Sequence, residues 1–126
     1  MEIDRLQALI ADFAAQREWQ KFHTPKNLVM ALTGEVGELS ELFQWLTAEE
    51  SMVIHTPERR ARVADEIADV FIYLLRLADV LDIDLVAATE SKLQTNAQRY
   101  PAEAVRGRAV KYSDLDSSHG SPNDGS

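Results

Sequence analysis

The chain has 126 residues, no cysteine and a formal net charge of −8 at pH 7. Disulfides and thiolate metal sites are therefore excluded, and a broad nucleic-acid-binding face, which needs basic residues, is not expected. Its length suits one domain, and 45% hydrophobic with 27% charged residues is typical of a globular protein. No apolar run approaches a membrane span and the N-terminus is not signal-like, so we expect a cytoplasmic protein without a membrane partner.

Four long helices are predicted in chain order, over residues 3–22, 25–46, 57–81 and 85–99. Thr24-Pro25 and Thr56-Pro57 each combine a capping hydroxyl with proline at the first helical position, so they predict the starts of the second and third helices. The connector 47–57 contains one possible helical turn at 48–52. No strand is predicted, so the fold class is all-α, a four-helix bundle.

Apolar stripes on the second and third helices are predicted to form the core. They comprise Leu28, Leu32, Leu39, Leu42, Phe43 and Leu46, then Val63, Ile67, Val70, Leu74, Leu77 and Leu81. The helices carry more apolar side chains than one core needs, which predicts a homo-oligomer. The predicted domain spans 1–112. Residues 113–126 are rich in Ser, Asp, Gly and Pro, so a disordered tail with an inert His119 is expected, and His55 is expected to be solvated.

Two carboxylate pairs dominate the sequence: Glu35 with Glu38, and Glu66 with Asp69. Residues at i and i+3 lie on one helix face, so each pair forms a two-carboxylate claw. Their neighbours are apolar, so we expect four buried carboxylates, which repel one another unless a cation lies between them. Oxygen-only ligands favour Mg²⁺ or Mn²⁺. A single pair is more often a surface feature; two pairs on apolar helices favour a metal site.

Other groups suit a phosphorylated ligand that carries a flat ring. Lys92, Asn96 and Arg99 are spaced i, i+4, i+7 on one face of the fourth helix and could hold phosphates. The aromatic candidates for stacking on the ring are Trp19, Trp45 and Tyr73. Glu41, one turn beyond Glu38, is the candidate general base, so the catalytic candidates are Glu35, Glu38 and Glu41.

Each of these candidates has a structural alternative. The aromatic residues could belong to the core. Lys92 and Arg99 could be solvated, or could pair with neighbouring glutamates. His23, which stands at a helix junction, is more often structural than catalytic in such a position.

Together these residues resemble the MazG-like, all-α nucleoside triphosphate pyrophosphohydrolases, and in particular the dCTP pyrophosphatase branch. The matching segments are Phe22-His23-x-Pro25-x-Asn27-Leu28, Gly34-Glu35-Val36-Gly37-Glu38-Leu39-x-Glu41-Leu42-Phe43-Gln44-Trp45, Asp65-Glu66-x-x-Asp69-Val70-x-Ile72-Tyr73-Leu74, Ser91-Lys92-x-x-x-Asn96-x-x-Arg99-Tyr100-Pro101 and Lys111-Tyr112. The similarity covers roughly residues 5 to 112. The paired acid motif is moderately specific, and the added aromatic and basic positions make it more so.

The resemblance implies cleavage of a deoxynucleoside triphosphate between its α and β phosphates, with Mg²⁺ bound by the four acids. It implies that Trp19, Trp45 and Tyr73 enclose the base and sugar near His23, and that Lys92 and Asn96 contact phosphate and sugar. It also implies a homotetramer built from dimers, with sites formed between subunits, and a role in cleansing the nucleotide pool, modified cytosine nucleotides included.

The sequence is compatible with other functions. Within the same class, the substrate could be dUTP or a broad range of triphosphates, because any base offers a face for stacking. In another class, the chain could be a non-catalytic helical module whose acids form an ordinary charged face. A di-iron carboxylate bundle needs a Glu-x-x-His motif, which the helices lack.

Overall fold

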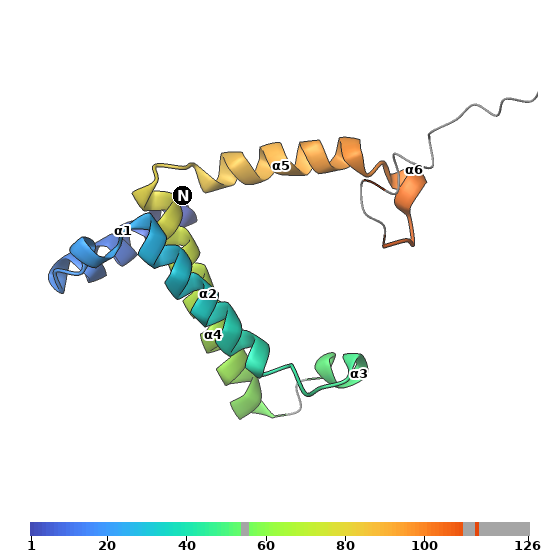
Figure 1. The fold of residues 1–126 in the computed structure, drawn as a ribbon, viewed down its shortest axis with the longest axis horizontal. Helices are drawn as coiled ribbons and strands as arrows, with labels where there is room; N and C mark the ends of the chain where they lie inside the picture. Colours follow the sequence, from blue (N-terminus) through green and yellow to red (C-terminus); the bar gives the residue numbers. More distant parts are fainter. Residues whose placement is uncertain (54–55, 110–112, 114–126) are drawn as a thin grey trace, which may run out of the picture. The chain divides into compact units, whose positions relative to one another are not determined.

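The computed structural model describes residues 1–53, 56–109 and 113, and within these ranges every regular element is helical (Figure 1). The elements are α1 (Glu2–Gln16), the 3₁₀ turn η1 (Gln20–Phe22), α2 (Pro25–Glu41), α3 (Ala48–Ser51), α4 (Pro57–Val80), α5 (Leu85–Arg99) and α6 (Ala102–Val105). The predicted all-α class is confirmed. Among the described helices, none is both long enough and apolar enough to cross a membrane.

The chain divides into two compact units, Met1–Asp84 and Leu85–Ser126, which we describe separately. This division falls inside the predicted 1–112 domain. The predictions made for His55, for Lys111-Tyr112 and for the tail beyond Ser113 lie outside the described residues.

Hydroxyl caps start both long helices of the first unit, as predicted. Thr24 Oγ1 accepts a hydrogen bond from the Asn27 N–H at 3.2 Å, and Thr56 Oγ1 accepts one from the Arg59 N–H at 3.1 Å. Each hydroxyl satisfies a first-turn N–H that has no partner inside the helix. The predicted turn in the connector is α3, which begins with a capping box between Thr47 and Glu50.

Two helices end earlier than their sequence patterns predict. The first stops at Gln16 rather than at 22, because Glu18 adopts a left-handed conformation with φ 54°. That conformation is costly for a residue with a Cβ and interrupts the helical hydrogen bonds. The Trp19 N–H then closes back onto the Ala14 carbonyl at 2.9 Å. α2 stops at Glu41 rather than at 46, so Trp45 lies in a turn beyond the helix.

The core of the first unit lies where α1 and α2 pack on α4. α2 and α4 run side by side in opposite directions (Figure 1), and Gln7 Nε2 on α1 donates to the Leu75 carbonyl of α4 at 3.1 Å. The buried apolar side chains among the described residues are Ala14, Leu28, Val63, Leu75 and Ala78. Burial of these side chains drives the packing of the three helices.

Burial along the predicted stripes is less complete than the sequence pattern implies. Leu28 and Val63 are buried, but Ile67 is 52% exposed, and Leu74 and Leu81 are also exposed. The predicted core assignment is wrong for these three positions in the single chain. The reason is geometric: α1 and α2 cover only part of the α4 circumference, so a broad apolar stripe extends past them.

Candidate functional site

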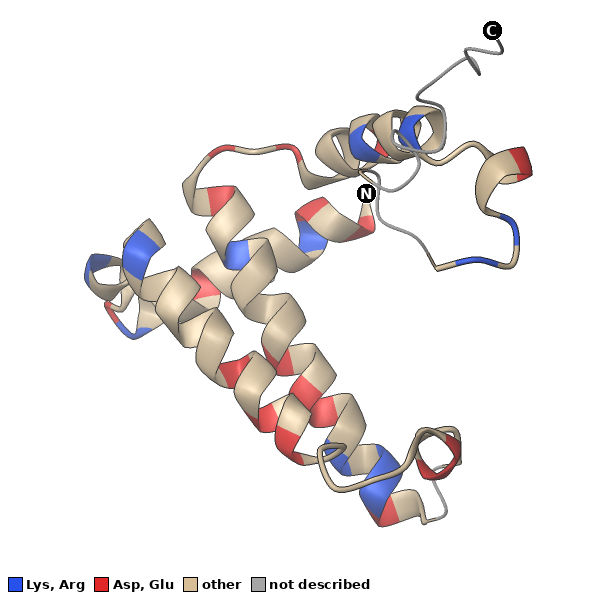
Figure 2. Cartoon of the chain, turned by 45° about the vertical axis from the view of Figure 1, so that its right-hand side comes forward, with Lys and Arg blue, Asp and Glu red and all other residues tan. Residues whose placement is uncertain are grey.

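The two predicted acid claws meet between α2 and α4. One carboxylate oxygen each from Glu35, Glu38 and Glu66 lies within 4.8 Å of the others, an arrangement that could hold a metal ion. Figure 2 shows acidic residues gathered along these paired helices. Asp69 lies outside this closest group, although its charge acts on both Glu35 and Glu66.

Exposure divides the four acids into two kinds. Glu38 and Asp69 are exposed, so the prediction of four buried carboxylates is wrong for these two; Glu35 and Glu66 are half-buried. The Oε2 atoms of Glu35 and Glu66 are shielded from solvent and have no hydrogen-bond partner. A shielded oxygen without a partner is unfavourable. A cation would supply the missing partner, and carboxylates alone suit a hard divalent ion.

The pKa values of the two shielded acids respond to this crowding. Burial raises the pKa of Glu35 above its ordinary value, and the adjacent carboxylate of Glu38, then the charges of Asp69 and Glu66, raise it further. The pKa of Glu66 is raised by burial first and then by the charges of Glu38 and Asp69. Burial and neighbouring negative charge thus both disfavour ionisation of Glu35 and Glu66, and a bound divalent cation would favour the ionised forms.

A pocket of about 560 Å³ opens beside the cluster. It is lined by Glu38, Glu41, Leu42, Gln44, Arg62 and Glu66. Glu41, the predicted general base, is thus on the wall shared with Glu38 and Glu66. Sequence reasoning did not assign Gln44 or Arg62 by chemistry; the spacing of Arg62 four residues before Glu66 is the signal that places it on the same face of α4.

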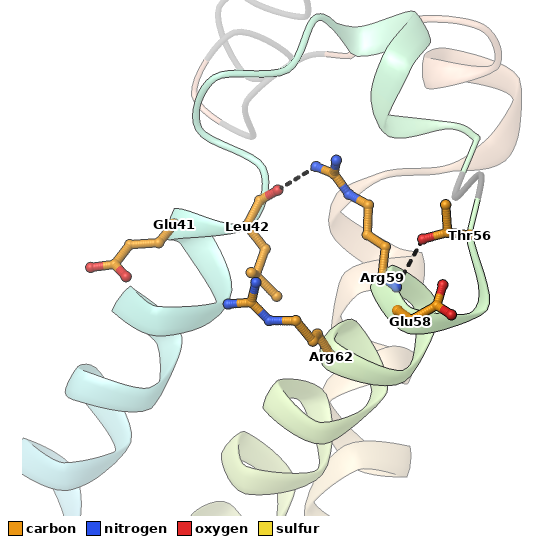
Figure 3. Close-up of a pocket in the computed structure, with 6 residues that line it drawn as sticks. All are labelled: Glu41, Leu42, Thr56, Glu58, Arg59 and Arg62. Carbon is orange, nitrogen blue, oxygen red and sulfur yellow. Dashed lines mark hydrogen bonds between the residues drawn. The ribbon is translucent and has the colours of Figure 1, made fainter.

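An adjoining pocket of about 460 Å³ lies between the end of α2 and the start of α4 (Figure 3). Its lining shares Glu41, Leu42 and Arg62 with the first pocket and adds Thr56, Glu58 and Arg59. Arg59 Nη2 donates to the Leu42 carbonyl at 3.0 Å. This hydrogen bond links the C-terminal end of α2 to the first turn of α4.

Two of the three aromatic candidates lie beyond opposite ends of α2. Trp19 and His23 precede the helix, whereas Trp45 follows it, and the 17-residue helix is about 25 Å long. Trp19 is 44% exposed and packs edge-to-face on Phe13 at 5.8 Å, and Trp45 is 87% exposed. Within one chain, therefore, Trp19 and Trp45 do not surround a single ring. Tyr73 is half-buried on α4.

The phosphate-binding candidates belong to the second unit. The predicted fourth helix is confirmed as α5, and it carries Lys92 and Arg99, which are exposed, and Asn96, which is half-buried. Their spacing places them along one side of α5. Their approach to a bound phosphate stays a prediction.

Known proteins resemble this chain in both sequence and fold. The sequence profile of the MazG-like family matches residues 31–115. The chain is 49% identical to dCTP pyrophosphatase 1 from Rattus norvegicus and 46% identical to dCTP pyrophosphatase 1 from Homo sapiens; each match covers 90% of this chain and 67% of the relative. A crystal structure of a pyrophosphatase from Archaeoglobus fulgidus is 39% identical, covers 80% of this chain and 94% of its own, and superposes with a TM-score of 0.75.

These findings define an enzyme of the all-α nucleoside triphosphate pyrophosphohydrolase class, as predicted. The chain belongs to the MazG-like family. The predicted resemblance to its dCTP pyrophosphatase branch is confirmed by the relatives that match. The interpretation as a non-catalytic helical module has no support among them.

Proposed function

We propose that this chain hydrolyses dCTP, or a base-modified dCTP, to the monophosphate and pyrophosphate, with Mg²⁺ as cofactor and Mn²⁺ as an alternative ion. Its role would be to cleanse the nucleotide pool in the cytoplasm. One observation carries the proposal: Glu35 and Glu66, whose Oε2 atoms are shielded and have no hydrogen-bond partner, form a close carboxylate group with Glu38 in a chain whose matched relatives are dCTP pyrophosphatases. A cation-binding cluster beside an open pocket suits a substrate that brings phosphate oxygens.

The acids have distinct roles in this proposal. Glu35, Glu38, Glu66 and Asp69 hold the ion, which when bound neutralises charge on the phosphate oxygens. Glu41, on the pocket wall beside Glu38 and Glu66, accepts a proton from the attacking water on a carboxylate oxygen. The water oxygen bonds to the α phosphorus, the bond from that phosphorus to the α–β bridging oxygen breaks, and pyrophosphate leaves.

The remaining predicted residues bind the nucleotide. Trp19, Trp45 and Tyr73 enclose the base, and Lys92, Asn96 and Arg99 contact phosphates and sugar. His23 Nδ1 accepts a hydrogen bond from Arg76 Nε, so the neutral ring carries its proton on Nε2. That N–H is available as a donor to a base or sugar acceptor.

Self-association accounts for the exposed apolar surface. A groove of about 430 Å³ between α1 and α4 has an almost wholly apolar lining, which is Leu6, Leu9, Ile10, Phe13, Ala68, Phe71, Ile72 and Leu75. An open apolar groove of this kind suits burial against a second copy. We propose a homotetramer built as a dimer of dimers, or a homodimer, in which a partner's tryptophan completes the base site.

Product analysis tests the proposed reaction. The wild-type protein is incubated with each standard deoxynucleoside triphosphate and with 5-methyl-dCTP, with Mg²⁺ or with chelator, beside Glu38→Gln. We expect monophosphate and pyrophosphate, strict dependence on the ion, and loss in the variant. The ranking of rates distinguishes dCTP from dUTP and from broad specificity. Well-folded wild-type protein that turns over no nucleotide contradicts the proposal.

A further inference from the structure

Arg62 extends the line of site residues along α4. Four residues of α4 are spaced by four, three and four positions, so they lie along one face of the helix. They are Arg62, Glu66, Asp69 and Tyr73. The acids are in the middle, Arg62 is towards the start of α4, and Tyr73 is towards its end. At 1.5 Å per residue, about 16 Å of helix separates Arg62 from Tyr73. A nucleotide laid along this face with its ring at Tyr73 points its terminal phosphates towards Arg62.

The Arg62 side chain lines both pockets beside the acid cluster. It shares one with Glu38 and Glu66, and the other with Arg59 and Glu58. Figure 3 shows Arg62 reaching from α4 across to the end of α2, where Leu42 lies. Within the described part of the chain, Arg62 makes no hydrogen bond or ion pair, whereas Arg59 donates to the Leu42 carbonyl.

A guanidinium in this position opposes metal binding. Arg62 stays charged at any ordinary pH, so it repels a cation held by Glu38 and Glu66. The repulsion becomes attraction when an anion lies between the two positive charges. The planar fork of arginine matches phosphate oxygens with two parallel hydrogen bonds. A chain of phosphates that contacts the metal at one end and Arg62 at the other places negative charge beside both positive groups.

We infer that Arg62 is a substrate-binding residue that holds the β and γ phosphates, the half of the nucleotide that leaves as pyrophosphate. The inference rests on the proposed function and adds to it an orientation: the pyrophosphate half occupies the pocket between the end of α2 and the start of α4. Negative charge grows on the leaving pyrophosphate as the bond breaks, and a fixed guanidinium beside it stabilises that charge.

Calorimetric titration with inorganic pyrophosphate in the presence of Mg²⁺ tests the inference without turnover. The variants are Arg62→Met, Arg62→Lys and, as matched control, Arg60→Met. Arg60 is also exposed and lies in the same turn, but it is two residues away on the helix and lines neither pocket. The same proteins are titrated with dCMP and, without nucleotide, with Mn²⁺.

We expect Arg62→Met to weaken pyrophosphate binding by about tenfold or more, the loss of a charge-assisted hydrogen bond. Arg62→Lys should lie between it and the wild type, because lysine keeps the charge but not the fork. Arg60→Met should bind normally. Affinity for dCMP should be unchanged in every variant. Affinity for Mn²⁺ should be unchanged or tighter in Arg62→Met, because a neighbouring positive charge has gone.

Several results overturn the inference: wild-type protein that does not bind pyrophosphate, unchanged affinity in Arg62→Met, or an equal loss in Arg60→Met. A joint loss of Mn²⁺ and pyrophosphate affinity assigns Arg62 a structural role instead. Failure of the proposed function is separable. If the wild type hydrolyses dCTP while Arg62→Met binds pyrophosphate normally, only the inference fails. If the wild type hydrolyses nothing yet binds pyrophosphate through Arg62, the proposed function fails, and Arg62 is a pyrophosphate-binding residue without a leaving-group role.

Discussion

Arg76 on α4 donates a hydrogen bond from Nε to Nδ1 of His23, over 3.1 Å, and so joins the segment before α2 to α4. Arg76 Nη1 also lies 3.6 Å from Asp79 Oδ2. Burial lowers the pKa of His23 below its ordinary value of 6.5, and the charge of Arg76 lowers it further. His23 is therefore neutral in the folded protein at neutral pH, and its acceptor nitrogen holds Arg76 in place.

Stability should depend on pH through His23. A histidine whose pKa is lowered by folding binds protons more weakly in the folded than in the unfolded state. Its contribution is complete above the ordinary pKa of 6.5 and is lost as pH falls below that value. We expect the melting temperature of the wild type, measured relative to that of His23→Gln, to fall as the pH is lowered from about 7.5 to about 5.5. Equal pH dependence in wild type and variant contradicts the assignment.

The acid cluster should destabilise the protein when metal is absent. Folding raises the pKa of Glu35, so the folded state binds its proton more tightly, and stability falls as pH rises above the ordinary value of 4.5. With chelator at neutral pH, Glu35→Gln should raise the melting temperature by a few degrees. With Mg²⁺ the order should reverse, since only the wild type gains stability from the ion. Thermal unfolding of both proteins under both conditions measures the sign change.

Glu38 and Glu41 should separate metal binding from proton transfer. Glu38 belongs to the closest oxygen group, so Glu38→Gln should weaken Mn²⁺ binding and lower kcat/KM by more than about 100-fold. Glu41 lines the pocket outside that group. Glu41→Gln should keep the Mn²⁺ affinity but lower kcat by about 100-fold, within the range of a lost general base. Full activity in Glu41→Gln removes it as the base.

The two tryptophans should respond differently to truncation. Trp45 is 87% exposed, so Trp45→Ala should leave the unfolding free energy of the chain nearly unchanged while raising KM for dCTP. Trp19 packs edge-to-face on Phe13, so Trp19→Ala should cost about 1 kcal/mol of stability beyond any effect on binding. Denaturant unfolding and steady-state kinetics give both values. Unfolding of Trp45→Ala would place this side chain in a core formed by association.

The apolar groove between α1 and α4 should govern oligomeric state. Phe71 and Ile72 line it and are exposed in the single chain. Phe71→Glu should lower the mass measured by light scattering, because a charge cannot be buried there without a partner. The control is Met52→Glu, an exposed apolar position outside the groove, which should keep the wild-type mass. An unchanged mass in Phe71→Glu excludes the groove as the contact.

Local signals explain why the helix starts are predictable from sequence. The hydroxyl and proline pairs at Thr24 and Thr56 act within one turn, so they do not depend on the rest of the fold. The meeting of the acid claws is predictable because their i, i+3 spacing fixes the face of each helix on which they lie. The spacing does not specify the distances between the carboxylate oxygens, so it does not predict that Asp69 lies outside the closest group.

Exposure is where pattern and structure differ most. The spacing of apolar residues predicts that Ile67 and Leu74 face the core, but both are exposed in the single chain. Spacing alone does not distinguish a stripe that packs inside the chain from one that packs against a second chain. The end of α1 at Glu18 involves a left-handed residue that is neither glycine nor asparagine, so no local sequence signal marks it. Arg62 resembles any surface arginine until the pockets are seen.

All four acids lie on α2 and α4, which are joined by residues 42–56, a connection that includes α3. Contacts between segments close in sequence form early in folding, because little chain entropy is lost in closing the loop. The acids of the claws are therefore brought together before the more distant contacts with α1 are made. With chelator, the mutual repulsion of the acids opposes this early step, so refolding should be slower than with Mg²⁺. An ion that binds the acids during synthesis would then accelerate folding as well as serve the proposed reaction.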